Sequence, residues 1–254
     1  MTIQKKLQQA FAQNRALKVI SGLNNLDRDN VTAVVKAAEA GGATFVDIAA
    51  APNLVQHIRN ITTLPVCVSA VSADAFVQAV EAGADLIEIG NFDSFYAQGR
   101  RFEAAEILEL TAQTRAKLPK ITLSVTVPHI LAFDEQVSLA QALVNTGADI
   151  IQTEGGTSSH PTHSGVLGLM EKAAPTLAAA HCISKAVSVP VICASGLSDV
   201  TVPLAIAAGA QGVGVGSAIN QLNDNVAMVA AVRRLVEALT SVKRQESQLT
   251  AQEF

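Results

Sequence analysis

Short apolar runs alternate along the chain with longer segments whose apolar residues recur at helical spacing. Four of the short runs follow a Gly-Ala pair, and three others follow a proline. The Gly-Ala runs span Gly42–Ile48, Gly83–Ile89, Gly147–Thr153 and Gly209–Val215, and the proline runs span Pro65–Ser69, Pro119–Ser124 and Pro190–Ser195. The two kinds alternate and Leu17–Ser21 precedes them, so the pattern predicts eight strands built as repeated pairs of βα modules.

The segments between these runs have the apolar spacing of helices. They are Asn30–Ala40, Asp74–Glu81, Phe102–Lys117, Gln136–Asn145, Thr176–Val187, Val200–Ala207 and Asn225–Ser241. Regular strand–helix alternation over 254 residues is typical of one α/β barrel, so we predict a single (β/α)8 TIM-barrel domain over residues 1–254. We expect residues 1–16 to form an extra N-terminal helix that plugs the barrel bottom, and residues 243–254 to form a frayed polar tail.

Composition and charge narrow the class of protein. The chain is 49% hydrophobic but only 4% aromatic, which predicts the aliphatic core of buried parallel strands. Its formal charge of −4 and its lack of a basic run argue against nucleic-acid and anionic-membrane partners. Cys67, Cys182 and Cys193 show no CxxC spacing and indicate reduced thiols. With no apolar run of membrane-spanning length and no signal-peptide pattern, we expect a cytoplasmic protein.

Strand periodicity predicts a polar column inside the barrel. Asp47, Glu88, Gln152 and Gly214 each stand five residues after a Gly-Ala glycine, between apolar neighbours. Alternation points this column inward, where Lys18 of the first strand joins it. A buried lysine with two carboxylates implies shifted protonation states, so Lys18, Asp47 and Glu88 are candidates for acid, base or Schiff-base catalysis. The alternative is a structural Lys18–Asp47 ion pair that fills the barrel floor.

The last two strands end in turns that suit an anion. Ser195-Gly196 follows the seventh strand, and Gly214-Val215-Gly216-Ser217 closes the eighth. Main-chain N–H groups at such turns attract phosphate, and glycine lets the phosphate approach the backbone. Barrels of this kind place their phosphate site in these two loops. We therefore expect Ser195, Gly196, Gly214, Gly216 and Ser217 to bind a phosphate group.

Loops at the carboxyl ends of other strands supply further candidates. His129 follows the fifth strand and Glu154 the sixth, where either can transfer a proton; a capping or solvated histidine is the alternative for His129. Asn24, Asn91 and Arg100 lie in the loops after the first and fourth strands. With Gln152, these three are candidate substrate-binding residues.

Two of these loops carry additional signals. Residues 90–101 contain the only tyrosine of the chain between glycines, which favours a ligand-covering loop; the alternative is aromatic packing that holds the loop down. His160 and His163 lie in a polar loop without an evident third ligand, so we expect no metal site.

With the residues in view, two resemblances emerge. The turns Ala194-Ser195-Gly196 and Gly214-Val215-Gly216-Ser217 resemble those of ribulose-phosphate-binding barrels, which include enzymes of tryptophan and histidine biosynthesis. Over nearly the whole chain, the strings KVISGLNN, VDIAAAPNLV, IEIGNFDSFYAQGR, LSVTVPH, QTEGGTSS, ICASGLS and GVGVGSAIN are similar to the hypothetical chloroplast open-reading-frame twenty-three family of cyanobacteria and algal plastids. The second resemblance implies the barrel and a cytoplasmic or plastid-stromal location, but no reaction.

These observations lead to one leading hypothesis and two alternatives. We expect an enzyme of isomerase, epimerase, aldolase or lyase type that acts on a small phosphorylated sugar or heterocycle without a cofactor. A regulatory protein that binds a phosphorylated metabolite is the first alternative, and an FMN-binding barrel is the second. A second copy of the chain is a candidate partner. The second and third strands lack the terminal lysine of several phosphosugar decarboxylases and synthases, so those mechanisms do not transfer.

Overall fold

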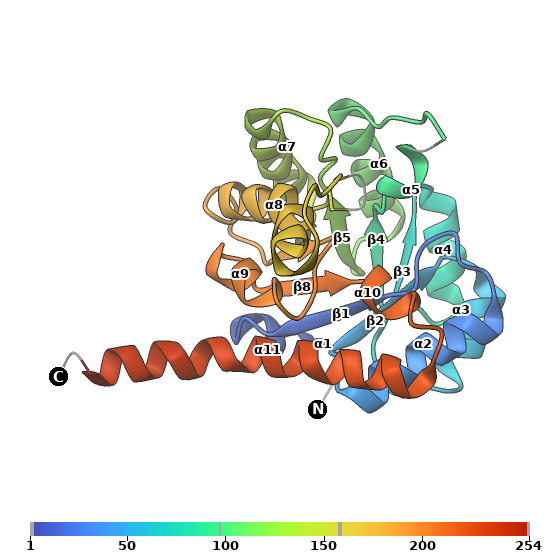
Figure 1. Cartoon of the computed structure of the whole chain (residues 1–254). Coiled ribbons are helices and arrows are strands. Elements are labelled where there is room, and N and C mark those ends of the chain that lie inside the picture. Colours follow the sequence, from blue (N-terminus) through green and yellow to red (C-terminus); the bar gives the residue numbers. More distant parts are fainter. Residues whose placement is uncertain (1–2, 97, 157–158, 253–254) are drawn as a thin grey trace.

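The computed structural model describes residues 3–96, 98–156 and 159–252, and within them eight parallel strands close into a barrel in chain order (Figure 1). The strands are β1 (Ala16–Ile20), β2 (Phe45–Ala49), β3 (Val66–Ala70), β4 (Leu86–Ile89), β5 (Thr122–Thr126), β6 (Ile150–Gln152), β7 (Val191–Ala194) and β8 (Gly212–Val215). Each strand pairs with its sequence neighbours, and β8 pairs with β1 to complete the ring. The predicted TIM-barrel fold is confirmed.

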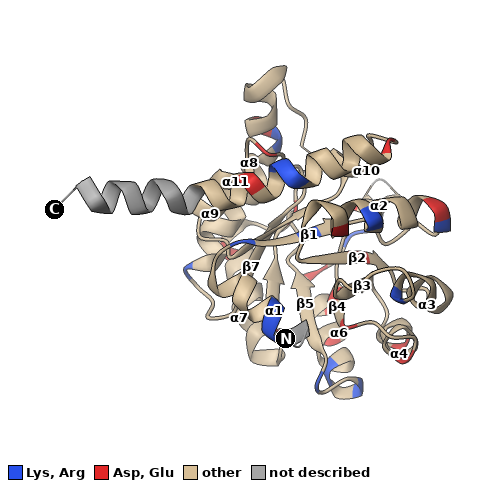
Figure 2. Ribbon diagram, turned by 90° about the horizontal axis from the view of Figure 1, so that it is seen from below, with Lys and Arg blue, Asp and Glu red and all other residues tan. Residues whose placement is uncertain are grey.

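Helices surround the strands and cover the outside of the barrel (Figure 1). They are α1 (Ile3–Ala12), α2 (Arg28–Gly41), α3 (Pro52–Arg59), α4 (Ala73–Glu81), α5 (Asp93–Tyr96), α6 (Ala104–Lys117), α7 (Phe133–Thr146), α8 (Gly165–Ser184), α9 (Val202–Ala207), α10 (Ser217–Asn220) and α11 (Asn225–Gln252). Basic and acidic residues are interspersed along the helices (Figure 2). Across the described ranges, no helix combines the length and the apolar character needed to cross a membrane.

Strand periodicity divides the side chains as predicted. The apolar neighbours of the polar column, such as Val46, Ile87 and Val213, are buried in one cluster with the inner faces of the helices. The glycines of the four Gly-Ala pairs adopt φ values between 91° and 110°, which ends the preceding helix in a left-handed residue. Sequence therefore dictates both where each helix stops and which side of the next strand faces inward.

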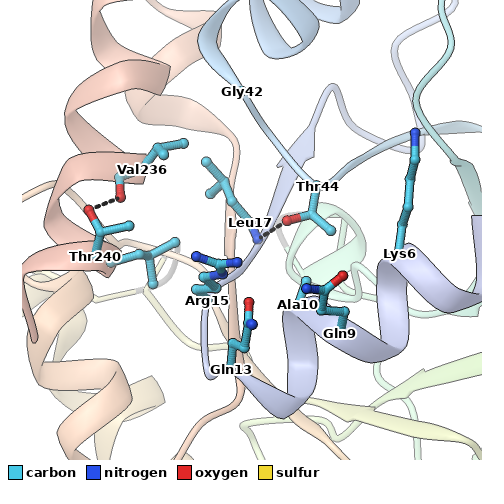
Figure 3. A pocket seen from close by; sticks show the side chains of 11 residues that line it. Lys6, Gln9, Ala10, Gln13, Arg15, Leu17, Gly42, Thr44, Val236 and Thr240 are labelled. Carbon is cyan, nitrogen blue, oxygen red and sulfur yellow. Dashed lines mark hydrogen bonds between the residues drawn. The ribbon is translucent and has the colours of Figure 1, made fainter. Parts of the chain in front are cut away.

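Helix α1 closes the bottom of the barrel. Its Leu7 and Phe11 pack against the lowest interior side chains, including Phe45 with a ring-centroid distance of 6.5 Å. A cavity of about 290 Å³ remains between α1, α11 and the start of β1, where Thr44 Oγ1 accepts a hydrogen bond from Leu17 N (Figure 3). This end of the barrel is the face that usually serves stability.

Four helices differ most from the sequence prediction: α3 and α5 were not predicted, and α8 and α11 have different ends. Helix α3 was not predicted, although Pro52 in its first turn is a common start signal. Helix α8 begins at Gly165 and continues through Pro175, where a break before Thr176 was expected. The loop after β4 contains the short helix α5. Helix α11 continues to Gln252, whereas the apolar spacing predicted its end at Ser241.

Candidate functional site

A cavity of about 420 Å³ opens at the carboxyl ends of the strands. The loops after β1, β4, β6, β7 and β8 line it, and they bring Asn24, Asn91, Gln152 and Glu154 together with the turns at Ser195 and Gly216. This is the end of the barrel at which enzymes of this fold carry their sites. We refer to this space as the mouth cavity.

Below the mouth cavity lies a buried ion cluster, which we call the floor. Lys18 Nζ lies 2.6 Å from Glu88 Oε2 and 3.5 Å from Asp47 Oδ2, and the three side chains are at most 1% exposed. Ser69 Oγ lies within 2.8 Å of both Asp47 oxygens, and Ser124 Oγ donates to Glu88 Oε2 over 2.8 Å. The predicted inward column thus meets as one hydrogen-bonded network.

The floor holds Lys18 in its charged form. Burial alone would lower the pKa of Lys18, but the charges of Glu88 and Asp47 raise it above its ordinary value. None of the three charged residues lines the mouth cavity. Both observations favour a structural ion pair over a catalytic role for these residues. The ion pair predicted between Lys18 and Asp47 also includes Glu88.

Two amides separate the floor from the mouth cavity. Asn91 Nδ2 donates to Ser69 Oγ over 2.9 Å, and Gln152 Nε2 donates to Glu88 Oε1 over 2.7 Å. Both residues also line the cavity above. Gln152 is 2% exposed, and its Oε1 is a buried oxygen with no hydrogen-bond partner among the described residues. Because its nitrogen is held by Glu88, the amide presents an acceptor that needs a donor from a ligand or water.

A second titratable group, which we call the mouth cluster, borders the cavity itself. Glu154 Oε1 accepts hydrogen bonds from Tyr96 Oη at 2.7 Å and from the main-chain N of His129 at 3.2 Å, and it lies 3.2 Å from His129 Nδ1. Asp93 Oδ1 lies 3.5 Å from the same imidazole nitrogen. The cluster therefore consists of Asp93, Tyr96, His129 and Glu154.

Protonation in the mouth cluster differs from that of isolated side chains. Burial raises the pKa of Glu154, although the hydrogen bond with His129 opposes this. Burial would lower the pKa of His129, but the hydrogen bond to Glu154 and the charges of Glu154 and Asp93 raise it. Burial and the nearby Glu154 charge raise the pKa of Tyr96. A carboxyl and an imidazole with raised pKa values, in contact beside a cavity, are suited to proton transfer.

The predicted phosphate turns line the same cavity as this cluster, and the first turn contacts it. Ser195 and Gly196 have φ values of 75° and 74°, and the main chain of the turn packs against Gly156, where an added Cβ would lie 2.3 Å from the Ser195 carbonyl oxygen. Among the described residues, the N–H groups of Gly196, Gly216 and Ser217 donate to no acceptor. Gly214 is buried in β8 and does not line the cavity, and the Ser195 hydroxyl donates to Asp93 Oδ2 over 2.9 Å.

Three other candidates lie away from the mouth cavity. Arg100 forms an ion pair with Glu106 of α6 and lies over the ring of Phe102, which directs it to the outer surface. His163 is exposed and contacts Glu171 at 2.5 Å. His160 is exposed and does not line the cavity.

The loop of residues 90–101 is anchored from both sides. Phe92 is fully buried and packs on Phe102 with a centroid distance of 4.5 Å, while Tyr96 bonds to Glu154. Aromatic packing, the alternative in the sequence interpretation, therefore holds the loop over the barrel. The sequence analysis did not identify Asp93 and Tyr96 as individual site residues. The available signal was Asp93 itself, an acidic residue that follows the fourth strand and begins the short helix α5.

Comparisons with known proteins agree with the fold. The family described as "Protein of unknown function (DUF561)" matches residues 3–245. The uncharacterized protein ycf23 of Pyropia yezoensis is 41% identical over 239 residues, covering 94% of this chain and 88% of that protein.

Solved structures resemble the chain in fold alone. Thiamine phosphate pyrophosphorylase from Pyrococcus furiosus aligns with a TM-score of 0.59 at 18% identity, over 91% of this chain and 98% of that one. The (S)-3-O-geranylgeranylglyceryl phosphate synthase of Thermoplasma acidophilum, solved with sn-glycerol-1-phosphate, aligns with a TM-score of 0.61 at 15% identity, over 95% and 99% of the two chains.

Proposed function

The chain belongs to the DUF561 family, and we propose that this member binds a small phosphorylated metabolite in the mouth cavity and moves a proton on it. The reaction class is that of an isomerase, epimerase, aldolase or lyase. One observation carries the proposal: the mouth cavity is lined both by turns with available N–H donors and by Glu154, which is hydrogen-bonded to His129.

The phosphate is assigned to the amides of Gly196, Gly216 and Ser217. Oriented N–H groups without internal acceptors stabilise an anion, and the cavity above them is large enough for a ligand of sugar-phosphate size. Several proteins of similar fold are named for phosphorylated compounds, including the two described above. That similarity supports the kind of ligand and leaves its identity open.

Proton transfer is assigned to the pair of Glu154 and His129. A buried carboxyl with a raised pKa can act as a base or an acid, and an imidazole in contact with it can exchange the same proton. A proton next to a carbonyl or imine is the target that fits both groups. Lys18 is not assigned a Schiff base, because a charged ammonium between two carboxylates is not a nucleophile.

The test is solvent exchange on a bound substrate. Triose, pentose and hexose phosphates are incubated with the protein in D2O, and deuterium incorporation is followed by NMR. We expect one class to acquire deuterium next to its carbonyl, and Glu154→Gln to reduce the rate at least about 100-fold while phosphate binding persists. Binding without exchange for every compound would contradict the enzymatic proposal and favour a regulatory protein.

A further inference from the structure

Three side chains of the mouth cluster converge on one point with metal-ligating atoms. Asp93, His129 and Glu154 each offer one ligand atom, and all three atoms lie within 4.8 Å of one another. Their side chains are only 11%, 17% and 4% exposed, so the group is part of the protein interior rather than a surface patch. The sequence analysis considered only His160 and His163 as metal ligands and therefore predicted no metal site. Neither histidine belongs to the group of Asp93, His129 and Glu154.

We propose that Asp93, His129 and Glu154 bind a first-row divalent cation, of the Mn²⁺, Co²⁺ and Zn²⁺ class, at the edge of the mouth cavity. His129 contributes Nδ1 and the two acids contribute one carboxylate oxygen each. The remaining coordination positions face the cavity and are available to water or to a ligand oxygen.

The separations match a shared cation. Atoms bound about 2.1 Å from one metal lie about 3.0 Å apart at right angles and about 3.4 Å apart in a tetrahedron. His129 Nδ1 lies 3.2 Å from Glu154 Oε1 and 3.5 Å from Asp93 Oδ1. His129 Nδ1 can therefore share a cation with either acid, and binding by all three residues requires their ligand atoms, which lie within 4.8 Å of one another, to close around the cation.

The ligands are held in orientation by groups behind them. Tyr96 Oη and the N–H of His129 both donate to Glu154 Oε1, and the N–H of Asp93 lies 3.3 Å from Glu154 Oε2. Ser195 Oγ donates to Asp93 Oδ2, and Asp93 Oδ1 lies 3.5 Å from His129 Nδ1. Hydrogen bonds of this kind fix metal-binding carboxylates in proteins and raise their affinity.

An independent observation in the same cavity also requires a donor. Gln152 Oε1 is buried, and no described residue donates to it. Gln152, the last residue of β6, and Glu154, in the loop that follows, both line the mouth cavity. Water bound to a cation is strongly polarised and is a suitable donor for such an orphan acceptor.

The donor set selects the class of cation. One imidazole with two carboxylates is harder than a thiolate site and softer than the all-oxygen sites that Ca²⁺ and Mg²⁺ prefer. The inference goes beyond the proposed function, which requires no metal. A cation on His129 Nδ1 and a Glu154 oxygen would displace the proton that these two groups share, so the metal-bound and proton-sharing forms of the cluster are separate states.

The experiment uses Co²⁺ alone and the single tyrosine of the chain. The sequence contains no tryptophan and Tyr96 is the only tyrosine, so tyrosine emission reports directly on the mouth cluster. Purified protein treated with a chelator is titrated with Co²⁺, and both visible d–d absorption and quenching of Tyr96 fluorescence are recorded. We expect saturation at one Co²⁺ per chain by both signals, and competition by Zn²⁺.

Matched variants separate this site from other histidines. Asp93→Asn, His129→Asn and Glu154→Gln should each weaken Co²⁺ binding at least about 10-fold. His163→Asn removes the exposed His163–Glu171 pair and should leave binding unchanged. Thermal unfolding of each variant checks the fold, and Zn²⁺ should raise the Tm of the wild type but not of the three ligand variants.

The outcomes are distinct. Absence of stoichiometric Co²⁺ and Zn²⁺ binding by the folded wild type would overturn the proposal, as would binding that disappears in His163→Asn and survives in Glu154→Gln. Phosphate binding is measured separately on metal-free protein, so a failed metal site and a failed phosphate site give different results.

Discussion

The floor and the mouth cluster each contain one aspartate and one glutamate, but the partners of these carboxylates differ. In the floor, a lysine forms ion pairs with two carboxylates, which also accept hydrogen bonds from serine hydroxyls and side-chain amides. None of these charged side chains lines the mouth cavity. The mouth cluster matches two carboxylates with a histidine and a phenol, and both carboxylates line the cavity. A fixed ammonium partner gives a permanent ion pair, whereas a titratable partner gives a group that can exchange protons or accept a metal.

The largest expected effect comes from breaking the floor. Lys18→Met leaves two buried carboxylates without their counter-charge, and we expect the free energy of unfolding to fall by about 3–5 kcal/mol. Glu154→Gln keeps an oxygen acceptor for Tyr96 and should change it by no more than about 1 kcal/mol. Urea denaturation of both variants measures the contrast. Equal losses would mean that the two regions are not functionally separate.

High pH should expose the same ion pair in the intact protein. Lys18 titrates near 10.5 when unfolded, and its pKa is higher in the folded state, so above pH 10.5 the folded chain binds more protons than the unfolded one. The stabilisation from Lys18 is complete below that pH and is lost as the pH rises through the folded-state pKa. Denaturation curves across this range should show that loss in the wild type and in the surface control Lys36→Met. Lys18→Met should lack it.

The smallest effect concerns thiols around the barrel. Burial raises the pKa of Cys193 to about 11 and raises that of Cys67, which lies beside the floor, well above its usual range. Alkylation of the native protein at mildly alkaline pH should therefore modify the half-buried Cys182 and spare the other two. Mass spectrometry identifies the sites, and unfolded protein provides the control. Rapid modification of Cys67 would show that solvent reaches the floor.

The barrel architecture could be predicted from the sequence because the features that specify it, helix ends and strand alternation, are local. Gly-Ala pairs ended helices in left-handed residues, and alternation along each strand decided which side chains face inward. The positions of Glu154 and of the Ser195 and Gly216 turns at the mouth followed from their places after the strands, and His129 contacts Glu154 there. Family membership, which the sequence strings indicated, is confirmed by the match to residues 3–245.

The height of a residue within the barrel could not be predicted in the same way. Alternation gives the facing side, but the stagger between strands sets the level, and that stagger depends on closure of the whole ring. Lys18 pairs in register with Phe45 and Gly214, which places it low in the barrel with Asp47 and Glu88. Asp93 and Tyr96 were missed because a short helix in a loop, not strand alternation, brings them to Glu154.

Phosphate binding at the mouth tests the central claim most directly. Isothermal titration with inorganic phosphate and sn-glycerol-1-phosphate is performed on the wild type and on the matched pair Ser217→Glu and Ser217→Gln, in which an exposed position changes in charge but not in size. We predict one site per chain that Ser217→Gln retains and Ser217→Glu loses by at least about 10-fold, because a carboxylate repels the phosphate from the adjacent amides. No binding by the wild type, or equal binding by both variants, would contradict the assignment of the mouth cavity as a phosphate site.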